Sequence, residues 1–298
     1  MEVLVIDVGG TAIKYALMND NAQFIEKGLL PTPKDKIEHF IEAIGSLYDK
    51  YKDKISGIAI SMPGRIDSEK GYLYTGGALE YNADKNIVSI LEKRCPVRIT
   101  VENDGKCAAL AEAWKGNLSD CNDGIVVVLG TGIGGGIIKD KKLHKGKQFV
   151  AGEFSFIITE NDFKKGEFSG FFASQSSVPA LCKLVAEAKK LNEEEVDGQV
   201  VFKYANNGDE EVLKILDDYC FKLAIQLHNL QHIYDPEKIA IGGGISKQDI
   251  LFEYIRKNIE RVVDSLPYVM AKPHVVKCKF NNESNLIGAL SVYVTTIN

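Results

Sequence analysis

The stretch at residues 125–138 constrains the fold more than any other, because an apolar run is interrupted in its middle by five glycines and one threonine. Residues 125–129 are consecutive apolar residues, mostly β-branched, and predict a buried strand. In the turn that follows, Gly130 and Gly132 flank Thr131 and carry no Cβ, so backbone N–H groups can approach an anion. We therefore expect a turn that holds phosphate, although a plain hairpin turn without a ligand has the same composition.

The spacing of these glycines also fits G-x-G-x-x-G, a fingerprint of dinucleotide-binding folds. Such a site needs a helix directly after the turn, whose N-terminus receives the pyrophosphate. Residues 135–140 instead contain two glycines and two isoleucines, which begin a helix poorly and continue a strand well. Strand, turn and strand are therefore expected, with Gly134 as a further phosphate contact. A nicotinamide-dependent dehydrogenase remains a weaker alternative, and NAD binding would reveal it.

The start of the chain repeats this design, since residues 3–17 predict a strand, a glycine turn and a second strand. Asp7 ends the first strand and Thr11 offers a hydroxyl, a set able to hold phosphate oxygens and a hydrated Mg²⁺. Two such hairpins suggest two similar halves. The residues expected to hold the nucleotide and its metal in this hairpin are Asp7, Gly9, Gly10, Thr11 and Lys14.

Length and charge limit the classes of function. A chain of 298 residues suggests about two domains. With 36 basic and 41 acidic residues the net charge is −5, and no block of like charge stands out, which argues against nucleic acid or an anionic membrane as the main partner. No secretory signal and no apolar run of membrane-spanning length is present.

The six cysteines are scattered without a C-x-x-C pair, so neither a disulfide framework nor a cysteine zinc site is indicated. They are expected to be reduced thiols of a cytoplasmic protein. His228 and His232 lie four apart on a predicted helix, but a third ligand is missing, so a metal site is not expected there.

Periodicity predicts the remaining elements. Strands are expected at 56–61, 97–101, 156–158 and 275–280, and one from residue 238 that ends in the glycines Gly242, Gly243 and Gly244. A glycine-lined strand end that opens a helix can admit a flat ring such as adenine. Helices are expected at 34–52, 86–94, 106–114, 178–190, 200–205, 209–234, 247–263 and 284–293.

Asp104 follows the strand at 97–101 and opens the helix at 106–114. An aspartate at this place is often only a helix N-cap. We expect a general base instead, because open α/β sheets bind their ligands at the carboxyl ends of the strands. The helix N-terminus should also favour the ionised carboxylate that a base needs at neutral pH.

Taken together, these residues resemble the ROK family of sugar kinases, and the likeness runs across the whole chain. Residues 7–11 look like the family's first phosphate motif, residues 129–136 like its second, and residues 241–246 like its adenosine motif. Each motif is modest alone, and their order is far more specific.

The resemblance also implies site residues. Asn103 and Asp104 are similar to the family's sugar-binding asparagine and catalytic aspartate, while Gly64 and Glu153 match positions in its sugar loops. Asn82 is expected beside them as a further sugar contact. The family's cofactors are ATP and Mg²⁺, with Asp7 expected to hold the metal through water, and its members form homodimers.

The implied fold is α/β and actin-like (ribonuclease H-like), with two α/β domains around a cleft. We expect residues 1–116 to carry the first hairpin and the catalytic aspartate. Residues 117–298 should carry the second hairpin and the adenosine motif, with the last helix able to pack back on the first domain.

The chain also departs from the family pattern. Many members continue Gly-Glu with x-Gly-His and a cysteine-rich zinc motif, but Ser155 and Phe156 stand here, and no cysteine lies between Cys121 and Cys182. We therefore expect no zinc site, as in the family's zinc-free β-glucoside kinase branch, although plain glucose stays possible as substrate.

The expected reaction is ATP-dependent phosphorylation of a sugar hydroxyl, of a hexose or a β-glucoside, at the 6-position. The alternative is a sugar-sensing regulator without kinase activity. Regulators of this family carry a DNA-binding segment before the first phosphate strand, where this chain has only Met1 and Glu2.

Overall fold

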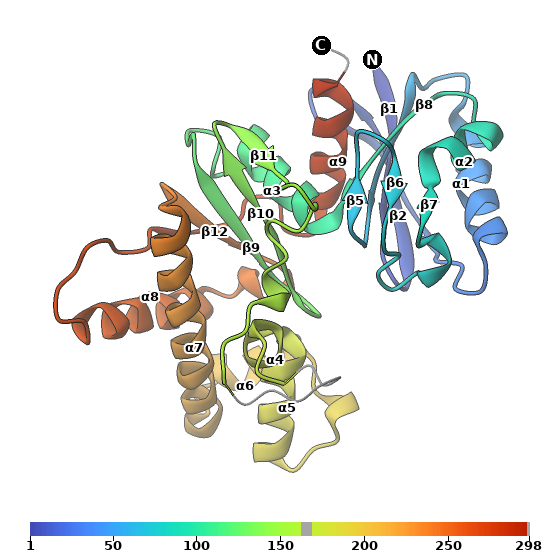
Figure 1. Cartoon of the computed structure of the whole chain (residues 1–298). Coiled ribbons are helices and arrows are strands. Elements are labelled where there is room, and N and C mark those ends of the chain that lie inside the picture. Colours follow the sequence, from blue (N-terminus) through green and yellow to red (C-terminus); the bar gives the residue numbers. More distant parts are fainter. Residues whose placement is uncertain (162–168, 297–298) are drawn as a thin grey trace.

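The computed structural model describes residues 1–161 and 169–296, which form two five-stranded sheets and a small three-stranded sheet (Figure 1). In the first sheet the strand order is β3-β2-β1-β4-β8. The neighbours β1, β4 and β8 pair in parallel, whereas β2 pairs antiparallel with both β1 and β3. Its strands are β1 (Glu2–Val8), β2 (Ala12–Asn19), β3 (Phe24–Pro31), β4 (Gly57–Met62) and β8 (Arg98–Asn103).

The second sheet repeats this topology, with the order β11-β10-β9-β12-β13 and the same sequence of antiparallel and parallel pairs. The expectation of two similar halves is therefore confirmed. Its strands are β9 (Gly124–Leu129), β10 (Ile133–Lys139), β11 (Lys142–His144), β12 (Lys238–Gly242) and β13 (Val275–Lys277). The small sheet consists of β5 (Ile66–Asp67), β6 (Tyr72–Leu73) and β7 (Lys85–Asn86).

Both glycine hairpins form as expected from the sequence. Val8 pairs with Ile13 across the first turn, and Leu129 pairs with Ile133 across the second. The strand expected at 156–158 is wrong, since residues 154–156 form a short 3-10 helix, η2 (Phe154–Phe156), and only a single bridge follows. The hairpins therefore stand at equivalent places in the two sheets.

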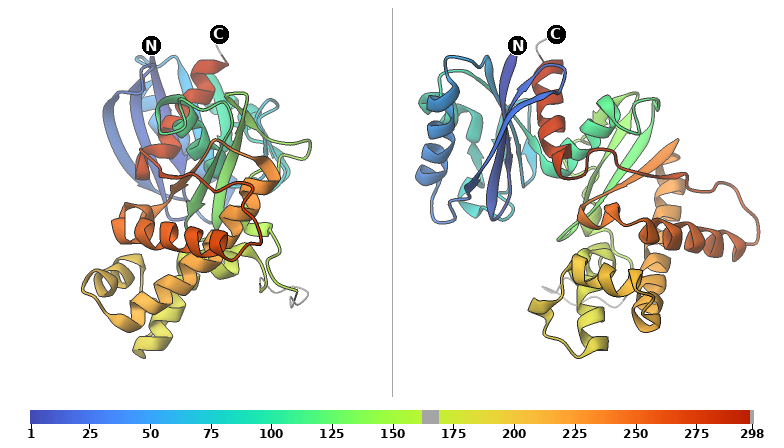
Figure 2. Two further views of the ribbon diagram at one scale, coloured as in Figure 1. Left: turned by 90° about the vertical axis from the view of Figure 1, so that its left-hand side faces the viewer. Right: turned by 180° about the vertical axis from the view of Figure 1, so that it is seen from behind.

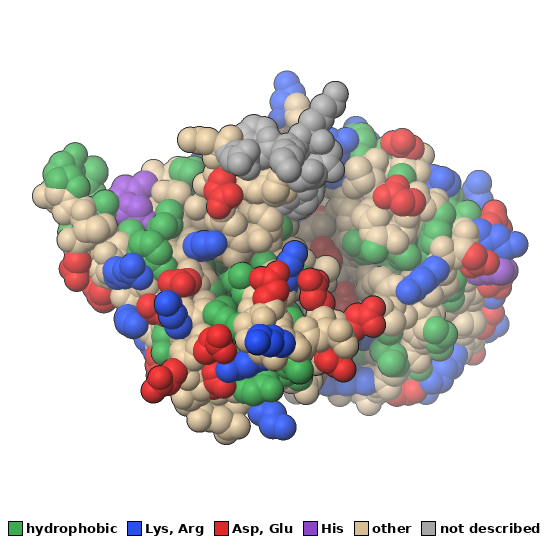
Figure 3. All heavy atoms as spheres, turned by 90° about the horizontal axis from the view of Figure 1, so that it is seen from below, with side chains coloured by type: hydrophobic (Ala, Val, Ile, Leu, Met, Phe, Trp, Pro, Cys, Tyr) green, Lys and Arg blue, Asp and Glu red, His purple; other side chains and the backbone are tan. Residues whose placement is uncertain are grey.

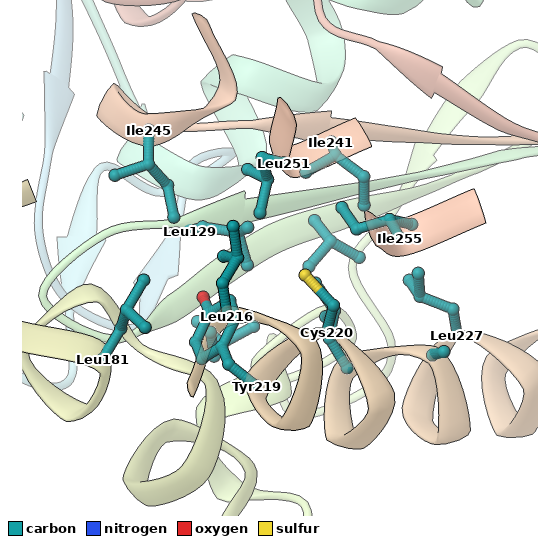
Figure 4. Packing of buried hydrophobic residues seen from close by; sticks show 14 of the residues in the cluster. Leu129, Leu181, Leu216, Tyr219, Cys220, Leu227, Ile241, Ile245, Leu251 and Ile255 are labelled. Carbon is teal, nitrogen blue, oxygen red and sulfur yellow. The ribbon is translucent and has the colours of Figure 1, made fainter. Parts of the chain in front are cut away.

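Helices cover the outer faces of both sheets. On the first sheet α1 and α2 bury an apolar face that the sequence spacing predicted. On the second sheet Leu216, Tyr219 and Leu227 of α7 pack toward Leu129 of β9 and Ile241 of β12 (Figure 4). The helices are α1 (Ile37–Tyr51), α2 (Ile87–Arg94), α3 (Asp104–Lys115), α4 (Phe172–Ser176), α5 (Val178–Lys189), α6 (Gly198–Asn206), α7 (Glu210–Tyr234), α8 (Asp249–Asp264) and α9 (Ser284–Thr295).

Two helices, α3 and α9, lie between the sheets (Figure 2). In α3, Cys107 and Ala111 pack with α9 and the first sheet, whereas Ala108 and Ala109 pack with the second sheet. Small side chains on both faces let the helix approach both neighbours, so the residues at its start are placed between the two halves of the molecule.

In the described part of the chain, no helix combines the length and the apolar character needed to cross a membrane.

Candidate active site

Asp104 is the first residue of α3, and the residue before it caps the helix. The Asn103 side chain accepts a hydrogen bond from the Lys106 backbone nitrogen at 3.1 Å. The interpretation of Asp104 as the N-cap is therefore wrong. Its carboxylate accepts a bond from the Gly105 nitrogen at 2.8 Å. The cap thus leaves Asp104 available for chemistry.

Burial is the main cause that raises the pKa of Asp104 to about 6, and the negative charges of Asp7 and Glu153 act in the same direction. The hydrogen bond from the Gly105 nitrogen and the positive charge of Lys106 lower the pKa, but they do not outweigh burial. The helix N-terminus was expected to favour the ionised form, but the overall shift is in the opposite direction, toward the protonated form. Loss of hydration and two like charges outweigh the helix end. A carboxyl with this pKa is still mostly ionised at pH 7 and suits a general base.

The second glycine hairpin touches the start of α3. A Cβ on Gly105 would lie 2.6 Å from the Gly135 nitrogen, and a Cβ on Gly136 would lie 2.7 Å from the Ala109 Cβ. Gly134 lies farther away, since a Cβ on Gly134 would be 3.9 Å from the Gly105 Cα. The glycines of β10 therefore let the hairpin pack against the helix that carries Asp104. The sequence predicted only phosphate binding for this hairpin and did not predict its packing role.

The turn of this hairpin is also held by a residue outside it. The Ser155 hydroxyl accepts a bond from the Ile133 nitrogen at 2.8 Å, and a Cβ on Gly132 would meet that hydroxyl oxygen at 2.7 Å. Ser155 stands where the resemblance expected a glycine. Its sequence position gave no sign of this contact.

In the first hairpin, Asp7 is buried and bonded from two sides. Its Oδ1 accepts bonds from Ser61 Oγ at 3.1 Å and Asn285 Nδ2 at 3.0 Å, and its Oδ2 lies 3.7 Å from Lys14 Nζ. Thr11 is exposed at the turn. Asn285 comes from α9, so a helix at the end of the chain helps to orient the first carboxylate. Sequence reasoning missed both polar partners of Asp7.

A cavity of about 820 Å³ lies beside the second hairpin. It is lined by Gly130, Thr131 and Gly244 from the predicted nucleotide set, together with parts of α5 and α6. Its further lining includes Asp197, Phe202, Lys203, Lys247, Gln248 and Asn282, none of which was predicted. The volume is that of a small-molecule site. Seen from below, the surface is also hollowed between the halves that carry the two sheets (Figure 3).

The three predicted glycines at the end of β12 differ in their surroundings. A Cβ on Gly243 would lie 2.0 Å from the Leu129 carbonyl oxygen, and one on Gly242 would lie 3.1 Å from Cys278 Sγ. A Cβ on Gly244 would meet nothing within 4 Å. Gly243 is therefore required by its close approach to the backbone of β9, Gly242 packs tightly against the Cys278 side chain, and Gly244 lines the cavity.

Glu153 lies close to the start of α3. Its Oε1 accepts a bond from Lys106 Nζ at 2.8 Å, and the Glu153 side chain is 30% exposed while that of Lys106 is 1% exposed. This ion pair holds Glu153 near the start of α3, where its negative charge raises the pKa of Asp104. A lysine in a predicted helix normally faces solvent, so the sequence contained no signal for Lys106.

Asn103 and Gly64 also meet, since Asn103 Nδ2 donates to the Gly64 carbonyl at 3.0 Å. Asn82 is fully buried, and neither polar atom of its side chain has a hydrogen-bond partner among the described residues. Buried amides are nearly always bonded, so a bound ligand or an ordered water is the expected partner. The predicted sugar residues therefore include one with unused bonding capacity.

A buried carboxylate, Glu102, lies directly before Asn103. It accepts bonds from the Asn103 nitrogen at 2.9 Å and from Ser68 Oγ at 2.7 Å, and it pairs with Lys145 Nζ at 3.1 Å. Lys145 follows β11 of the second sheet, whereas Glu102 lies in β8 of the first, one residue before its end. This ion pair was not predicted, and it joins the two halves beside the site.

Within residues 1–161 and 169–296, no group of three or more His, Cys, Asp or Glu side chains is placed to hold a metal ion. His232 Nδ1 lies 2.9 Å from the His228 carbonyl oxygen, as expected for helix neighbours. Asp7 could hold a hydrated Mg²⁺ through its carboxylate, since this ion usually keeps several waters and takes one or two carboxylates together with phosphates.

Residues 3–295 match the model of the ROK family. Among curated proteins, a beta-glucoside kinase of Klebsiella pneumoniae is 28% identical over 292 residues, which cover 97% of this chain and 95% of that protein. A solved ROK family protein from Streptococcus pneumoniae, in complex with sucrose, is 26% identical, with a TM-score of 0.89 over 100% of this chain and 99% of that chain.

A solved ROK family glucokinase from Streptomyces griseus, in complex with glucose and AMPPNP, is 22% identical, with a TM-score of 0.84 over 98% of this chain and 99% of that chain. These likenesses confirm the expected actin-like ATPase fold.

Proposed function

The chain belongs to the ROK family and is an ATP-dependent sugar kinase, and we propose that it phosphorylates the 6-hydroxyl of a hexose or a β-glucoside. One observation carries the finer proposal: α3 starts with Asp104 at the carboxyl end of β8 and touches the second glycine hairpin. A carboxylate there is placed to take the proton of a hydroxyl that attacks a phosphoryl group held by the hairpins.

The nucleotide is assigned to the cavity beside the second hairpin. Adenosine would lie against Gly244, and the phosphates would reach the turn at Gly130 and Thr131. Asp7 would hold Mg²⁺ through water, and the ion would neutralise charge on the phosphates. The carboxylate fits this role because two neutral donors, Ser61 and Asn285, orient its Oδ1, while Lys14 Nζ lies 3.7 Å from Oδ2.

The sugar is assigned to the side of Asp104 that faces Asn103 and Glu153. Asn103 Nδ2 has a second hydrogen beyond its bond to Gly64, and Asn82 has unused donors and an unused acceptor. Amide and carboxylate groups of this kind suit sugar hydroxyls. Such contacts would place one hydroxyl at the Asp104 carboxylate.

Two features favour a substituted sugar over free glucose. Phe156 stands where many family members have a histidine, so an apolar surface replaces a polar contact. The Klebsiella pneumoniae relative is a beta-glucoside kinase, and the Streptococcus pneumoniae protein was solved with sucrose, a disaccharide. We therefore rank β-glucosides first and free hexoses second.

A coupled ADP-release assay over hexoses, N-acetylhexosamines and β-linked disaccharides tests this proposal. We expect turnover with at least one β-glucoside, and NMR of the product should place the phosphate on the 6-oxygen. If no sugar in the panel is turned over, the assignment of substrate is refuted. If the phosphate is found on another oxygen, the assignment to the 6-hydroxyl is refuted.

We further propose that residues 1–116 and 117–298 act as two domains that close over the sugar and exclude water. A homodimer in the cytoplasm that does not bind DNA completes the proposal. Six free, buried cysteines support a reducing compartment. Light scattering tests the dimer, small-angle scattering with and without sugar tests closure, and a gel shift tests DNA binding.

A further inference from the structure

Lys106, in the first turn of α3, is buried to an extent that is unusual for a lysine. Only 1% of its side chain is exposed. Its Nζ donates to Glu153 Oε1 at 2.8 Å and to the Phe149 carbonyl at 3.1 Å. A buried ammonium group persists only when it is paired and bonded, and both acceptors belong to residues 145–153. The lysine therefore joins the helix of Asp104 to this loop.

The loop itself adopts a backbone that needs support. Phe149 has a φ of 60°, in the left-handed region that bulky residues rarely occupy, and its carbonyl is the one that Lys106 binds. Gly152 has a φ of 85°, and a Cβ there would lie 2.8 Å from the Gly136 Cα. The loop thus runs tightly over β10 and delivers Glu153 at its end.

A second contact extends from Phe149. Its ring stacks on Tyr74, with ring centroids 5.8 Å apart and an angle of 20° between the planes. Tyr74 is bonded through its nitrogen to the Arg65 carbonyl at 2.9 Å, next to Gly64. Lys106 is therefore connected, through Phe149 and Tyr74, to the loop of Gly64 as well as to that of Glu153, the two positions that resemble the family's sugar loops.

The carboxylate of Glu153 bridges two environments. Its side chain is 30% exposed, while the lysine behind it is shielded from water. Because Lys106 occupies Oε1, the other oxygen is oriented and left for a ligand. The positive charge of Lys106 also lowers the pKa of Asp104, which burial and the charges of Asp7 and Glu153 raise.

Resting on the sugar-kinase function proposed above, we propose that Lys106 is a positioning residue for the sugar. Its ammonium group orients the Glu153 carboxylate toward a sugar hydroxyl and fixes residues 145–153 against the start of α3. The lysine does not touch the sugar. Its effect should therefore appear in the binding of the sugar and not in the binding of ATP.

Two substitutions separate the contacts of this side chain. Lys106→Met keeps the length and apolar stem but removes every donor, and Lys106→Gln keeps donors without the charge. We expect Lys106→Met to raise the KM for the sugar about tenfold or more, since a charged hydrogen bond is lost, with the KM for ATP changed less than about twofold. Lys106→Gln should lie between this variant and the wild type.

Lys142→Met is the matched control, because it removes the same charge at an exposed position of β11, outside residues 145–153. Its KM for the sugar should equal that of the wild type. A double-mutant cycle with Glu153→Gln should be clearly less than additive, since both changes disable one contact. Calorimetric titration of the sugar without ATP should reproduce the KM effects, and circular dichroism reports whether each variant is folded.

The outcomes separate this inference from the function on which it rests. A wild type without turnover on any sugar overturns the proposed function. If the wild type is active and either folded variant keeps the wild-type KM for the sugar, the positioning role is wrong. A loss that falls equally on sugar and ATP, or effects of Lys106→Met and Glu153→Gln that simply add, also overturns it.

Discussion

Gly105, the second residue of α3, lies so close to Gly135 of β10 that a Cβ on Gly105 would be 2.6 Å from the Gly135 nitrogen. This contact sets the distance between the residue that opens α3, Asp104, and the second glycine hairpin. The geometry of the proposed phosphoryl transfer thus depends on a position without a side chain.

Gly105→Ala should lower kcat about tenfold or more, because the new methyl group pushes the start of α3 away from β10, and small misplacements of catalytic groups are costly. In the interior of a solvent-exposed helix, the same change from glycine to alanine would stabilise the helix by about 1 kcal/mol. Steady-state kinetics and thermal unfolding measure both effects. Gly134→Ala, on the other side of the contact, has room for its Cβ and should leave the melting temperature unchanged; equal destabilisation by both variants would contradict this account.

Asp104→Asn should lower kcat by about 10²–10⁴-fold, the usual contribution of a general base. Affinity for ATP should stay close to that of the wild type, because Asp104 is not part of the nucleotide cavity. The coupled assay and a nucleotide titration measure the two quantities. Asp53→Asn at an exposed position serves as control. Wild-type turnover in Asp104→Asn would remove this residue from the mechanism.

The pH dependence of activity should follow the carboxyl of Asp104. Since burial raises its pKa to about 6, kcat/KM for the sugar should fall as the pH drops below about 6. The reference value for an aspartate is 3.8, so an unperturbed base would keep its activity two pH units lower. A profile that stays flat down to pH 4 would show that Asp104 does not act as the base.

The same pKa predicts an effect on stability. The folded state binds the Asp104 proton more tightly than the unfolded chain does. The protonated carboxyl therefore adds to the free energy of unfolding below about pH 4, and this contribution is lost as the pH rises through about 6. Asp104→Asn should therefore unfold at a higher temperature than the wild type at pH 7. At pH 4 the two melting temperatures should converge. An Asn variant that is less stable at pH 7 would indicate that the carboxylate stabilises the fold.

Gly244→Val should weaken ATP binding without unfolding the protein. A Cβ there would meet nothing within 4 Å, so the backbone tolerates a side chain, but the side chain enters the cavity of about 820 Å³. We expect the KM for ATP to rise about tenfold, which corresponds to roughly 1.4 kcal/mol. The KM for the sugar and the melting temperature are the internal controls. An unchanged KM for ATP would place adenosine elsewhere.

Several features of the fold were predictable from the sequence, because they arise from neighbouring residues. Both glycine hairpins follow from β-branched runs interrupted by glycine, and the helices that cover the sheets follow from apolar spacing. The place of Asp104 at the end of a strand and the start of a helix was also readable locally. The strand expected at 156–158 failed, because a short apolar run does not distinguish a strand from a turn that packs on another element.

Other features appear only when distant segments meet. Lys106 and Glu153 are 47 positions apart, and the partners of Asp7 include Asn285 at the far end of the chain. The pKa of Asp104 was expected from its helix end, but its value depends on burial and on charges from other elements. No local pattern contains these distances.

By itself, the sequence of this protein determined its repeating strand-and-hairpin plan and the candidate residues, because backbone preference and apolar periodicity act over a few neighbours. Only the tertiary structure decided which glycines serve packing and which, like Gly244, face a cavity. It also decided that Asn103 caps the helix, leaving Asp104 free, and that a buried lysine pairs with Glu153. Desolvation and electrostatic interactions depend on the full set of neighbours in space, and folding brings those neighbours together.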